Sequence, residues 1–275
     1  MNVPAKLAGF GAGLALLFGG AALAGGAAGP LHDTSDKKDD AMQMHTAPDA
    51  VRGLAVSDDG LNLELARTTA APGARFDLAF RITDRDGRTV KGFDVEHTKR
   101  MHLIVVRRDM TGFQHLHPVQ RADGSWAVPA TIARPGTYRV FADFSTGGDR
   151  HTLGADLDVP GAATSVPLPA PARTATVDGY RVTLAGGPAR AGEEADLRFS
   201  VTRDGRPATV LPYLGALGHL VALREGDLAF LHVHPDENQL RFMAELPSAG
   251  RYRLFLQFRT ATGVHTAPFT LEVAR

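Results

Sequence analysis

Residues 102–117 read HLIVVRRDMTGFQHLH, and residues 219–234 read HLVALREGDLAFLHVH. Each stretch begins and ends with histidine and carries a third histidine two positions before its end. In both, two apolar runs flank a polar centre that contains glycine, a pattern typical of two antiparallel strands joined by a turn. The two stretches therefore predict the same β-hairpin at two places in the chain.

The similarity continues beyond the hairpins. A Gly-x-Tyr-Arg-x-Phe segment follows each of them, starting at Gly136 and at Gly250. Thirteen residues after the tyrosine of each segment stands another histidine, His151 or His265. The sequence thus contains one structural unit twice, and we expect two domains of the same fold.

Short apolar runs separated by turn residues fill the first unit. About seven strands in roughly 110 residues is the count of an immunoglobulin-like sandwich. We therefore predict an all-β fold of two tandem immunoglobulin-like antiparallel β-sandwiches. The expected strands of the first are Leu61–Leu65, Phe76–Ile82, His102–Arg107, Phe113–His117, Trp126–Ile132, Tyr138–Phe144 and Ala155–Val159.

Composition changes mark the domain boundaries. We place the first sandwich at 51–160 and the second at 172–275. Between them, 161–171 is rich in proline and alanine, which predicts a stiff linker.

The N-terminal segment 1–30 predicts export. Lys6 precedes an uncharged, apolar run from residue 7 to residue 29. It is long enough for a transmembrane anchor, whereas Ala22-Leu23-Ala24 fits the cleavage site of a signal peptide, and both interpretations remain open. A buried hydrophobic helix of the globular fold is disfavoured, because each glycine weakens a soluble helix by about 1 kcal/mol. We expect the protein outside the cytoplasm. It would be anchored to the membrane by an N-terminal hydrophobic helix in 1–30, or secreted after cleavage of that segment.

A flexible tether is expected at 31–50, where the sequence is short, polar and mixed in charge. It contains Met42, Met44 and His45, whose thioethers and imidazole suit Cu(I). An ordinary spacer explains the same residues equally well.

Composition excludes several functions. Thirty basic and thirty acidic side chains cancel, so no global field would attract nucleic acid. There is no cysteine, which excludes disulfides, thiolate nucleophiles, iron–sulfur clusters and blue-copper sites.

The hairpins should bring the histidines together. Turns centred on residues 109–110 and 226–227 set His102 across from His117 and His219 across from His234. Directly opposed residues share a face of the sheet, and so does a residue two positions along the strand. His115 and His232 should therefore join these pairs.

Clustered imidazoles point to a metal ion. They would repel one another if protonated, whereas an ion satisfies their lone pairs together. A single histidine on such a strand is more often packed structurally, but two clusters favour metal. We predict metal ligands in two sets, with the late histidine of each unit as its fourth member: His102, His115, His117 and His151, and His219, His232, His234 and His265.

All-imidazole ligand sets suit copper or zinc rather than calcium or magnesium. Met101 and Met110 beside the first set favour copper. His97 occurs only in the first unit, where its counterpart position is near Leu214, so the two domains need not bind metal equally. We expect a binding protein rather than an enzyme, because four ligands leave no open position and no nucleophile or general base lies beside the histidines in the sequence.

The stretches KRMHLIVV (99–106) with FQHLHP (113–118), and GHLV (218–221) with LHVHP (231–235), resemble bacterial exported heavy-metal-binding proteins with immunoglobulin-like or cupredoxin-like domains. The resemblance covers both domains and the N-terminal segment. It implies metal handling outside the cytoplasm without naming a partner. For a protein that sequesters or handles metal there, we expect a metal transporter or an exported metalloprotein as partner, and the balanced charge argues against nucleic acid.

Two other functions remain open. A bicupin-like metalloenzyme would use a His-x-His with a downstream Glu, and Glu237 follows His234 at suitable spacing. The first unit breaks that pattern, because no carboxylate follows His117 in the same way. The other is an adhesion or scaffold module in which the histidines are structural.

Overall fold

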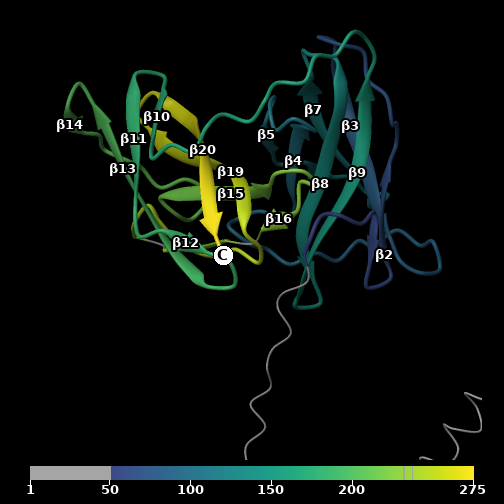
Figure 1. The fold of residues 1–275 in the computed structure, drawn as a ribbon. Helices are drawn as coiled ribbons and strands as arrows, with labels where there is room; N and C mark the ends of the chain where they lie inside the picture. The colour runs from purple at the N-terminus through teal and green to yellow at the C-terminus, as the bar shows by residue number, and fades with distance from the viewer. Residues whose placement is uncertain (1–50, 232, 237) are drawn as a thin grey trace, which may run out of the picture. The chain divides into compact units, whose positions relative to one another are not determined.

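The first sandwich consists of two antiparallel sheets (Figure 1). The computed structural model describes residues 51–231, 233–236 and 238–275, and the predictions for 1–30 and 31–50 lie outside these residues. One sheet has the order β1 (Ser57–Asp58), β2 (Leu61–Leu65), β3 (Arg75–Thr83), β7 (Trp126–Thr131) and β6 (Val119–Gln120). The other has the order β5 (Gln114–Leu116), β4 (His102–Arg107), β8 (Gly136–Thr146) and β9 (Asp149–Val159).

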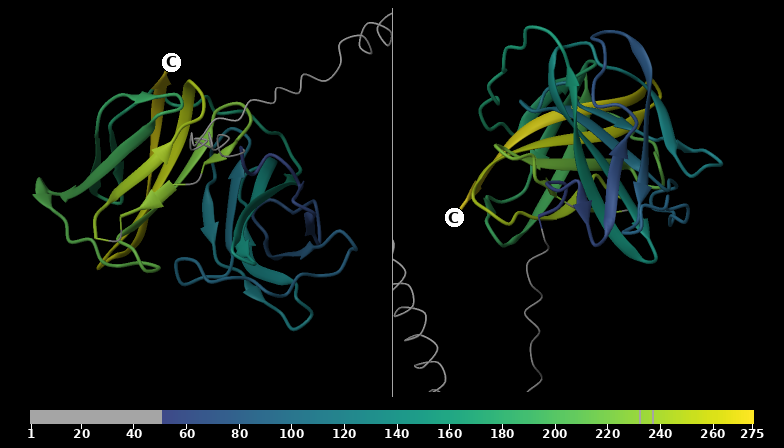
Figure 2. Two further views of the ribbon diagram at one scale, coloured as in Figure 1. Left: turned by 90° about the horizontal axis from the view of Figure 1, so that it is seen from below. Right: turned by 90° about the vertical axis from the view of Figure 1, so that its right-hand side faces the viewer.

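The second sandwich repeats this arrangement (Figure 2). It has one parallel pairing, between β12 and β20. One sheet contains β10 (Thr174–Val177), β11 (Tyr180–Ala185), β13 (Glu194–Arg203), β18 (Arg241–Glu245) and β17 (Val233–Pro235), with β14 (Arg206–Pro207) beside β13. The other has the order β12 (Ala189–Arg190), β20 (Gly263–Ala274), β19 (Gly250–Thr260), β15 (Gly218–Arg224) and β16 (Phe230–Leu231).

The all-β prediction is confirmed. The described residues form strands and turns, and this part of the chain contains no helix that would span a membrane. The boundaries of β2 and β4 are those expected from the sequence. Each sandwich has its own apolar core, to which every second residue of the inner strands contributes, such as Leu103 and Val105.

A tyrosine stands near the start of the equivalent late strand of each sandwich, β8 or β19, and is almost fully buried. The hydroxyl of Tyr138 donates a hydrogen bond to the carbonyl of Arg134 at 2.9 Å. The hydroxyl of Tyr252 donates to the carbonyl of Ser248 at 2.8 Å. In both cases the acceptor lies four residues upstream, which is the tyrosine corner of immunoglobulin-like domains.

Replacing Tyr138 by phenylalanine is expected to lower the free energy of unfolding by about 1 to 2 kcal/mol, because the carbonyl of Arg134 loses its buried donor. Urea unfolding of the variant and its parent measures the difference. Tyr213→Phe is the control, since no hydrogen bond of its hydroxyl is found among the described residues. Equal losses for the two variants would contradict the role of the corner.

The linker region contains no strand between Val159 and Thr174, so no sheet continues across it. It is nevertheless fastened to the first sandwich. The buried pair Arg107 and Asp109 binds its backbone: Arg107 donates to the carbonyl of Thr164 at 3.0 Å, and Asp109 accepts from the amide of Val166 at 2.9 Å. The linker is therefore a docked segment rather than a free spacer.

A third apolar cluster joins the two sandwiches, which belong to one compact unit, Ala47–Arg275. Phe113 stacks on Phe255 with ring centroids 4.0 Å apart, and Phe141 packs on Phe230 at 5.5 Å. Phe113 and Phe230 are equivalent residues of the two units, and so are Phe141 and Phe255. Each unit thus offers the same two aromatic positions to the other. Ile104 and Val106, on the outer face of β4, belong to this cluster, and His102 lies on the same face.

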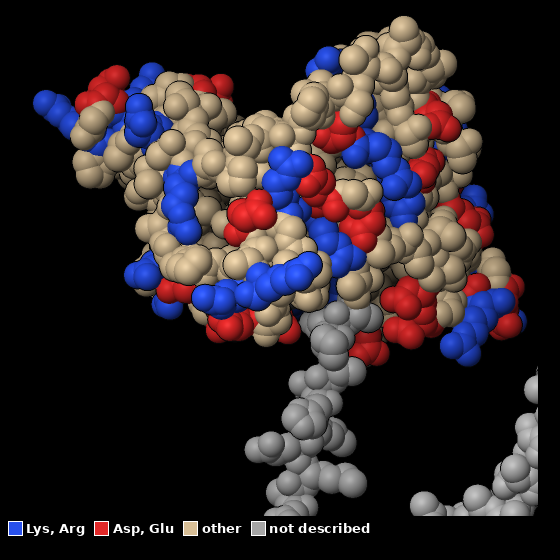
Figure 3. Space-filling model, viewed as in Figure 1, with Lys and Arg blue, Asp and Glu red and all other residues tan. Residues whose placement is uncertain are grey.

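The surface charges are mixed. On the face seen in Figure 3, arginine and lysine alternate with aspartate and glutamate, and no large area carries a single sign. This distribution agrees with the balanced composition.

Candidate metal centre

The first hairpin adopts the predicted register. Leu103 pairs with Leu116 and Ile104 with His115, so the next position along the ladder sets His102 across from His117. The ring centroids of these two histidines lie 5.2 Å apart. The expected grouping of His102, His115 and His117 on one face is confirmed.

The three imidazoles have the spacing of ligands to one ion. One nitrogen from each ring lies within 4.8 Å of the others. The ring centroids are separated by 5.2 Å for His102 and His115 and by 4.7 Å for His115 and His117. Imidazoles that bind one tetrahedral ion through nitrogens at about 2 Å have centroids roughly 5 Å apart. A zinc or copper ion therefore fits between the three rings.

Hydrogen bonds to the outer nitrogens orient two of these rings. Nδ1 of His115 lies 2.7 Å from Oε1 of Gln257, which comes from the second sandwich. Nε2 of His102 lies 3.3 Å from the carbonyl of Glu96. If both nitrogens donate, Nδ1 of His102 and Nε2 of His115 carry lone pairs that face each other at 3.0 Å. A shared cation relieves that repulsion.

The same contacts also allow a metal-free state. Rotating the amide of Gln257 by half a turn makes it the donor to Nδ1 of His115. Nε2 of His115 then carries the proton and donates it to Nδ1 of His102. Thr266, which now accepts from Gln257 at 3.2 Å, can donate to it instead. The choice of tautomer thus couples the cluster to the second sandwich.

His117 supplies a buried nitrogen without a partner. Its Nε2 makes no hydrogen bond to any described residue. Such buried polar atoms are rare and call for a ligand, an ion or water. In the tautomer in which the outer nitrogens of His102 and His115 donate, their inner lone pairs and Nε2 of His117 form the donor set of a metal site.

His219 of the second sandwich adjoins the cluster. Its Nε2 donates to the carbonyl of Tyr213 at 2.9 Å, as Nε2 of His102 does to Glu96, six residues upstream in both cases. Its ring centroid lies 6.3 Å from that of His115. The duplicated unit has therefore reproduced both a histidine and its backbone acceptor, and the contact between sandwiches brings the copies together.

A cavity of about 60 Å³ adjoins these rings. Its polar lining comes from both sandwiches and includes His97, Asp143 and His219, with apolar residues of the second sandwich completing the wall. His97 stands with its ring centroid 5.3 Å from that of His219. The sequence reveals His97 as a histidine peculiar to the first unit, but it gives no signal that Asp143 and Gln257 belong here.

Burial keeps the cluster neutral. It lowers the pKa of His102, His117 and His219 from 6.5 to about 4 in each case. The pKa of His115 also falls well below 6.5, for the same reason and because other imidazoles are near. Desolvation raises the pKa of Asp143 to about 6. Imidazoles with these pKa values are unprotonated at neutral pH, which is the form that binds metal.

The late histidines do not join the clusters, which corrects the expectation for His151 and His265. His151 pairs with Phe144 across β8 and β9, and both side chains are in the core of the first sandwich. His102 pairs with Asp143, one residue earlier, and therefore lies on the opposite face of the same sheet. The second sandwich repeats this, with His265 beside Phe258 on the core side.

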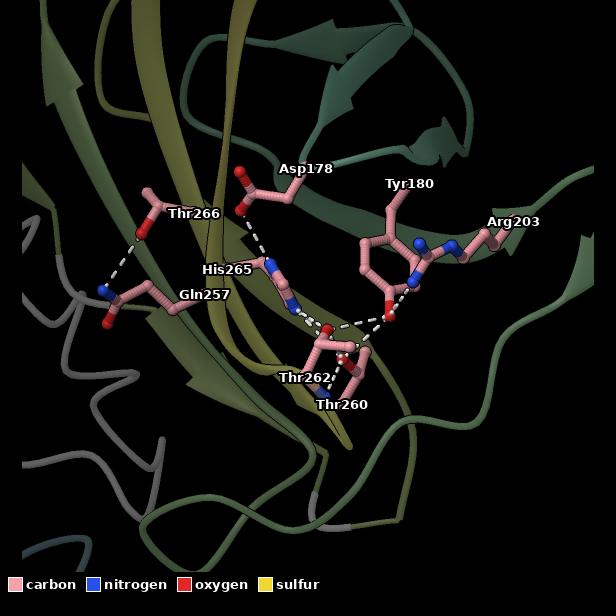
Figure 4. A network of polar contacts seen from close by, with 8 residues as sticks. All are labelled: Asp178, Tyr180, Arg203, Gln257, Thr260, Thr262, His265 and Thr266. Carbon is pink, nitrogen blue, oxygen red and sulfur yellow. Dashed lines mark hydrogen bonds and ion pairs between the residues drawn. The ribbon is translucent and has the colours of Figure 1, made fainter.

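His265 has structural partners on both sides of its ring (Figure 4). Nδ1 lies 2.7 Å from the carboxylate of Asp178, and Nε2 lies 3.0 Å from the hydroxyls of Thr260 and Thr262. Tyr180 completes the network through the same hydroxyls. With both nitrogens engaged, this imidazole has no lone pair directed at an ion.

The second hairpin differs from the first after its turn. Ala222 pairs with Leu231 in the expected register, but the chain then crosses to the other sheet. His234 pairs there with Met243, so the predicted pairing of His219 with His234 is wrong. His232 and the side chain of His234 lie outside the described residues. Their role as metal ligands stays a prediction.

The comparisons with known proteins concern the repeat and the fold. The family model described as "Domain of unknown function (DUF8832)" matches twice, at residues 55–161 and 175–275. No curated protein matches the chain.

Several solved structures show weak likeness. The Escherichia coli adhesin FdeC is 14% identical with a TM-score of 0.27, and the match covers 80% of this chain and 66% of that one. Escherichia coli alpha-2-macroglobulin activated by porcine elastase is 15% identical with a TM-score of 0.28, covering 78% and 20%. The bacterial integrin-binding protein invasin is 11% identical with a TM-score of 0.22, covering 78% and 39%. The chain spans less than two thirds of the length of each, and at these scores the likeness supports no argument about function.

Proposed function

The chain belongs to the DUF8832 family, and we propose that it is an exported protein that binds copper or zinc between its two sandwiches. The observation that carries the proposal is the cluster of His102, His115 and His117, whose ring spacing fits one ion and whose inner nitrogens lack a full set of hydrogen bonds. The N-terminal segment supports export. The paired tyrosine corners support an immunoglobulin-like class for the sandwiches, and the cupredoxin-like alternative rests on the sequence resemblance.

His219 is the fourth ligand in this proposal, in place of His151. The ring centroids of His219 and His115 lie 6.3 Å apart, which is about 1 Å more than the spacing expected for two imidazoles on one tetrahedral ion. Metal binding would therefore draw the two sandwiches slightly together. Its Nε2 is held by a backbone carbonyl, which leaves Nδ1 as the ligand atom. Four nitrogen ligands would make the site a carrier or buffer of metal and leave no position for a substrate.

The adhesion or scaffold function has one observation in its favour. His265 is fixed by hydrogen bonds, as expected of a structural histidine. The bicupin-like enzyme has less support, because the first unit has no carboxylate equivalent to Glu237. A scaffold would bind no ion tightly, which separates it from a metal carrier.

Metal analysis tests the proposal. The full chain is exposed to copper and zinc together, passed through a desalting column and analysed for both elements. We expect one tightly held ion for the site between the sandwiches. Retention of less than about a tenth of an equivalent after desalting would contradict metal binding as the function.

Gln257→Leu is expected to weaken metal binding by about 10- to 100-fold, because the acceptor that orients His115 is lost although no ligand is removed. Competition with a chromophoric chelator measures the affinity. Gln239→Leu, which changes an exposed glutamine far from the cluster in sequence, is the control. Equal affinity of Gln257→Leu and the parent would show that His115 is not oriented from the second sandwich.

A further inference from the structure

The turn between β1 and β2 brings two carboxylates to a buried histidine. Asp58 and Asp59 are exposed, whereas His151 is 5% exposed. One ligand atom from each of the three lies within 4.8 Å of the others. This group lies on the core side of β9 and is separate from the cluster of His102, His115 and His117.

The second sandwich contains the same turn, but there a single aspartate forms a hydrogen bond with the buried histidine. Asp178 and Asp59 occupy equivalent positions before glycine and share a left-handed backbone, with φ values of 48° and 49°. Asp178 binds Nδ1 of His265 directly at 2.7 Å. The position equivalent to Asp58 holds Val177, so only the first sandwich has the second carboxylate.

His151 and His265 have nearly the same orientation. The ring centroids of His151 and Phe144 lie 5.5 Å apart, with an angle of 32° between the ring planes. For His265 and Phe258 the centroid distance is 5.3 Å and the angle is 35°. One ring nitrogen of His151 lies within 4.8 Å of the carboxylate oxygens of its aspartate turn. Unlike Nδ1 of His265, Nδ1 of His151 is buried and has no hydrogen-bond partner within the described ranges.

The two carboxylates, of Asp58 and Asp59, are not engaged in ion pairs among the described residues. The side chain of Arg85 packs over Gly60 in the same turn without forming such a pair. Two carboxylates and one imidazole within 4.8 Å of one another form a ligand set that a single cation can bind.

We propose that Asp58, Asp59 and His151 form a second metal site, which takes a divalent ion with mixed oxygen and nitrogen ligands. Carboxylates suit manganese and imidazole suits zinc, so both ions fit this set better than Cu(I) does. The exposed side of the turn leaves water to complete the coordination shell. The site is independent of the centre between the sandwiches.

Titration of the full chain with Mn²⁺, followed by loss of the free-ion electron paramagnetic resonance signal, tests the site. Asp58→Val reproduces the second sandwich, and Asp59→Asn keeps a residue that tolerates the left-handed backbone. Each is expected to weaken Mn²⁺ binding at least about tenfold, because one charged ligand is lost. Asp204→Asn, at another left-handed turn position, should bind as the parent does.

Repeating the titration with His115→Ala/His117→Ala separates the two sites. We expect this variant to retain Mn²⁺ binding, since the changed residues lie on the other face of the sheet. The proposal is overturned if the parent binds no Mn²⁺, or if Asp58→Val and Asp59→Asn bind it as the parent does. Thermal unfolding without metal confirms that the variants are folded, and neither result depends on copper or zinc binding between the sandwiches.

Discussion

Replacing His115 and His117 together by alanine is expected to abolish tight binding of copper or zinc between the sandwiches. Two of the three closely spaced imidazoles disappear, and those that remain, His102 and His219, come from different sandwiches. A pair of nitrogen ligands cannot fill a tetrahedral zinc site. Equilibrium dialysis against zinc should show the loss of about one bound ion and a fall in affinity of at least roughly a thousandfold.

The matched control is His32→Ala/His45→Ala, which also removes two histidines but from the tether. This variant should bind zinc with the affinity of the parent. If the His115 and His117 variant binds as much zinc as its control, the imidazoles are structural and the scaffold function is favoured.

Acidification is expected to destabilise the metal-free protein between pH 6.5 and about pH 4. The pKa of His102 and of His219 is about 4 in the folded state and 6.5 when unfolded, so protons bind the unfolded chain first as the pH falls. Each buried imidazole then costs on the order of 3 kcal/mol of stability. Asp143 acts in the opposite direction. Its pKa is raised to about 6 in the folded state, so as the pH falls the folded protein takes up this proton before the unfolded chain does. This uptake stabilises the folded state and offsets the loss caused by about one imidazole.

His117 has the same folded-state pKa of about 4, so three imidazoles contribute, and after the offset by Asp143 the net loss should be on the order of 6 kcal/mol between pH 7 and pH 4, measured as the free energy of unfolding in urea. His102→Gln/His219→Gln is the comparison variant, because it removes two of the buried titrating imidazoles and keeps polar side chains. Its stability should change less over the same range. A parent whose stability is flat between pH 7 and pH 4 would show that these imidazoles are not buried as described.

The fold was largely predictable because local patterns determine it. Strand boundaries such as those of β2 and β4 follow from apolar runs that end at turn residues. β9 begins at Asp149 rather than at Ala155, because the mostly polar first half of the strand also pairs with β8. The crossing of the second hairpin to the other sheet has no such local signal, since its apolar pattern matches that of the first.

The site was predictable only in part, for the same reason. Hairpin register places His102 opposite His117, since a short turn fixes the pairing. Whether His151 points into the core or away from it depends on the register of β9 against β8. In the structure it pairs with Phe144 and therefore points into the core. The spacing between Tyr138 and His151 does not reveal this register. His219 and Gln257 reach the cluster through the packing of one sandwich on the other, which no repeat pattern contains.

X-ray absorption at the metal edge, with one equivalent of zinc on the full chain, tests the centre most directly. We predict a first shell of three or four nitrogen atoms at about 2.0 Å with the outer-shell scattering of imidazole rings, and no sulfur. Scattering from four imidazole rings that falls to three in His219→Gln would identify His219 as a ligand. A shell of oxygen atoms without imidazole scattering, or no bound zinc, would contradict a histidine metal centre between the sandwiches.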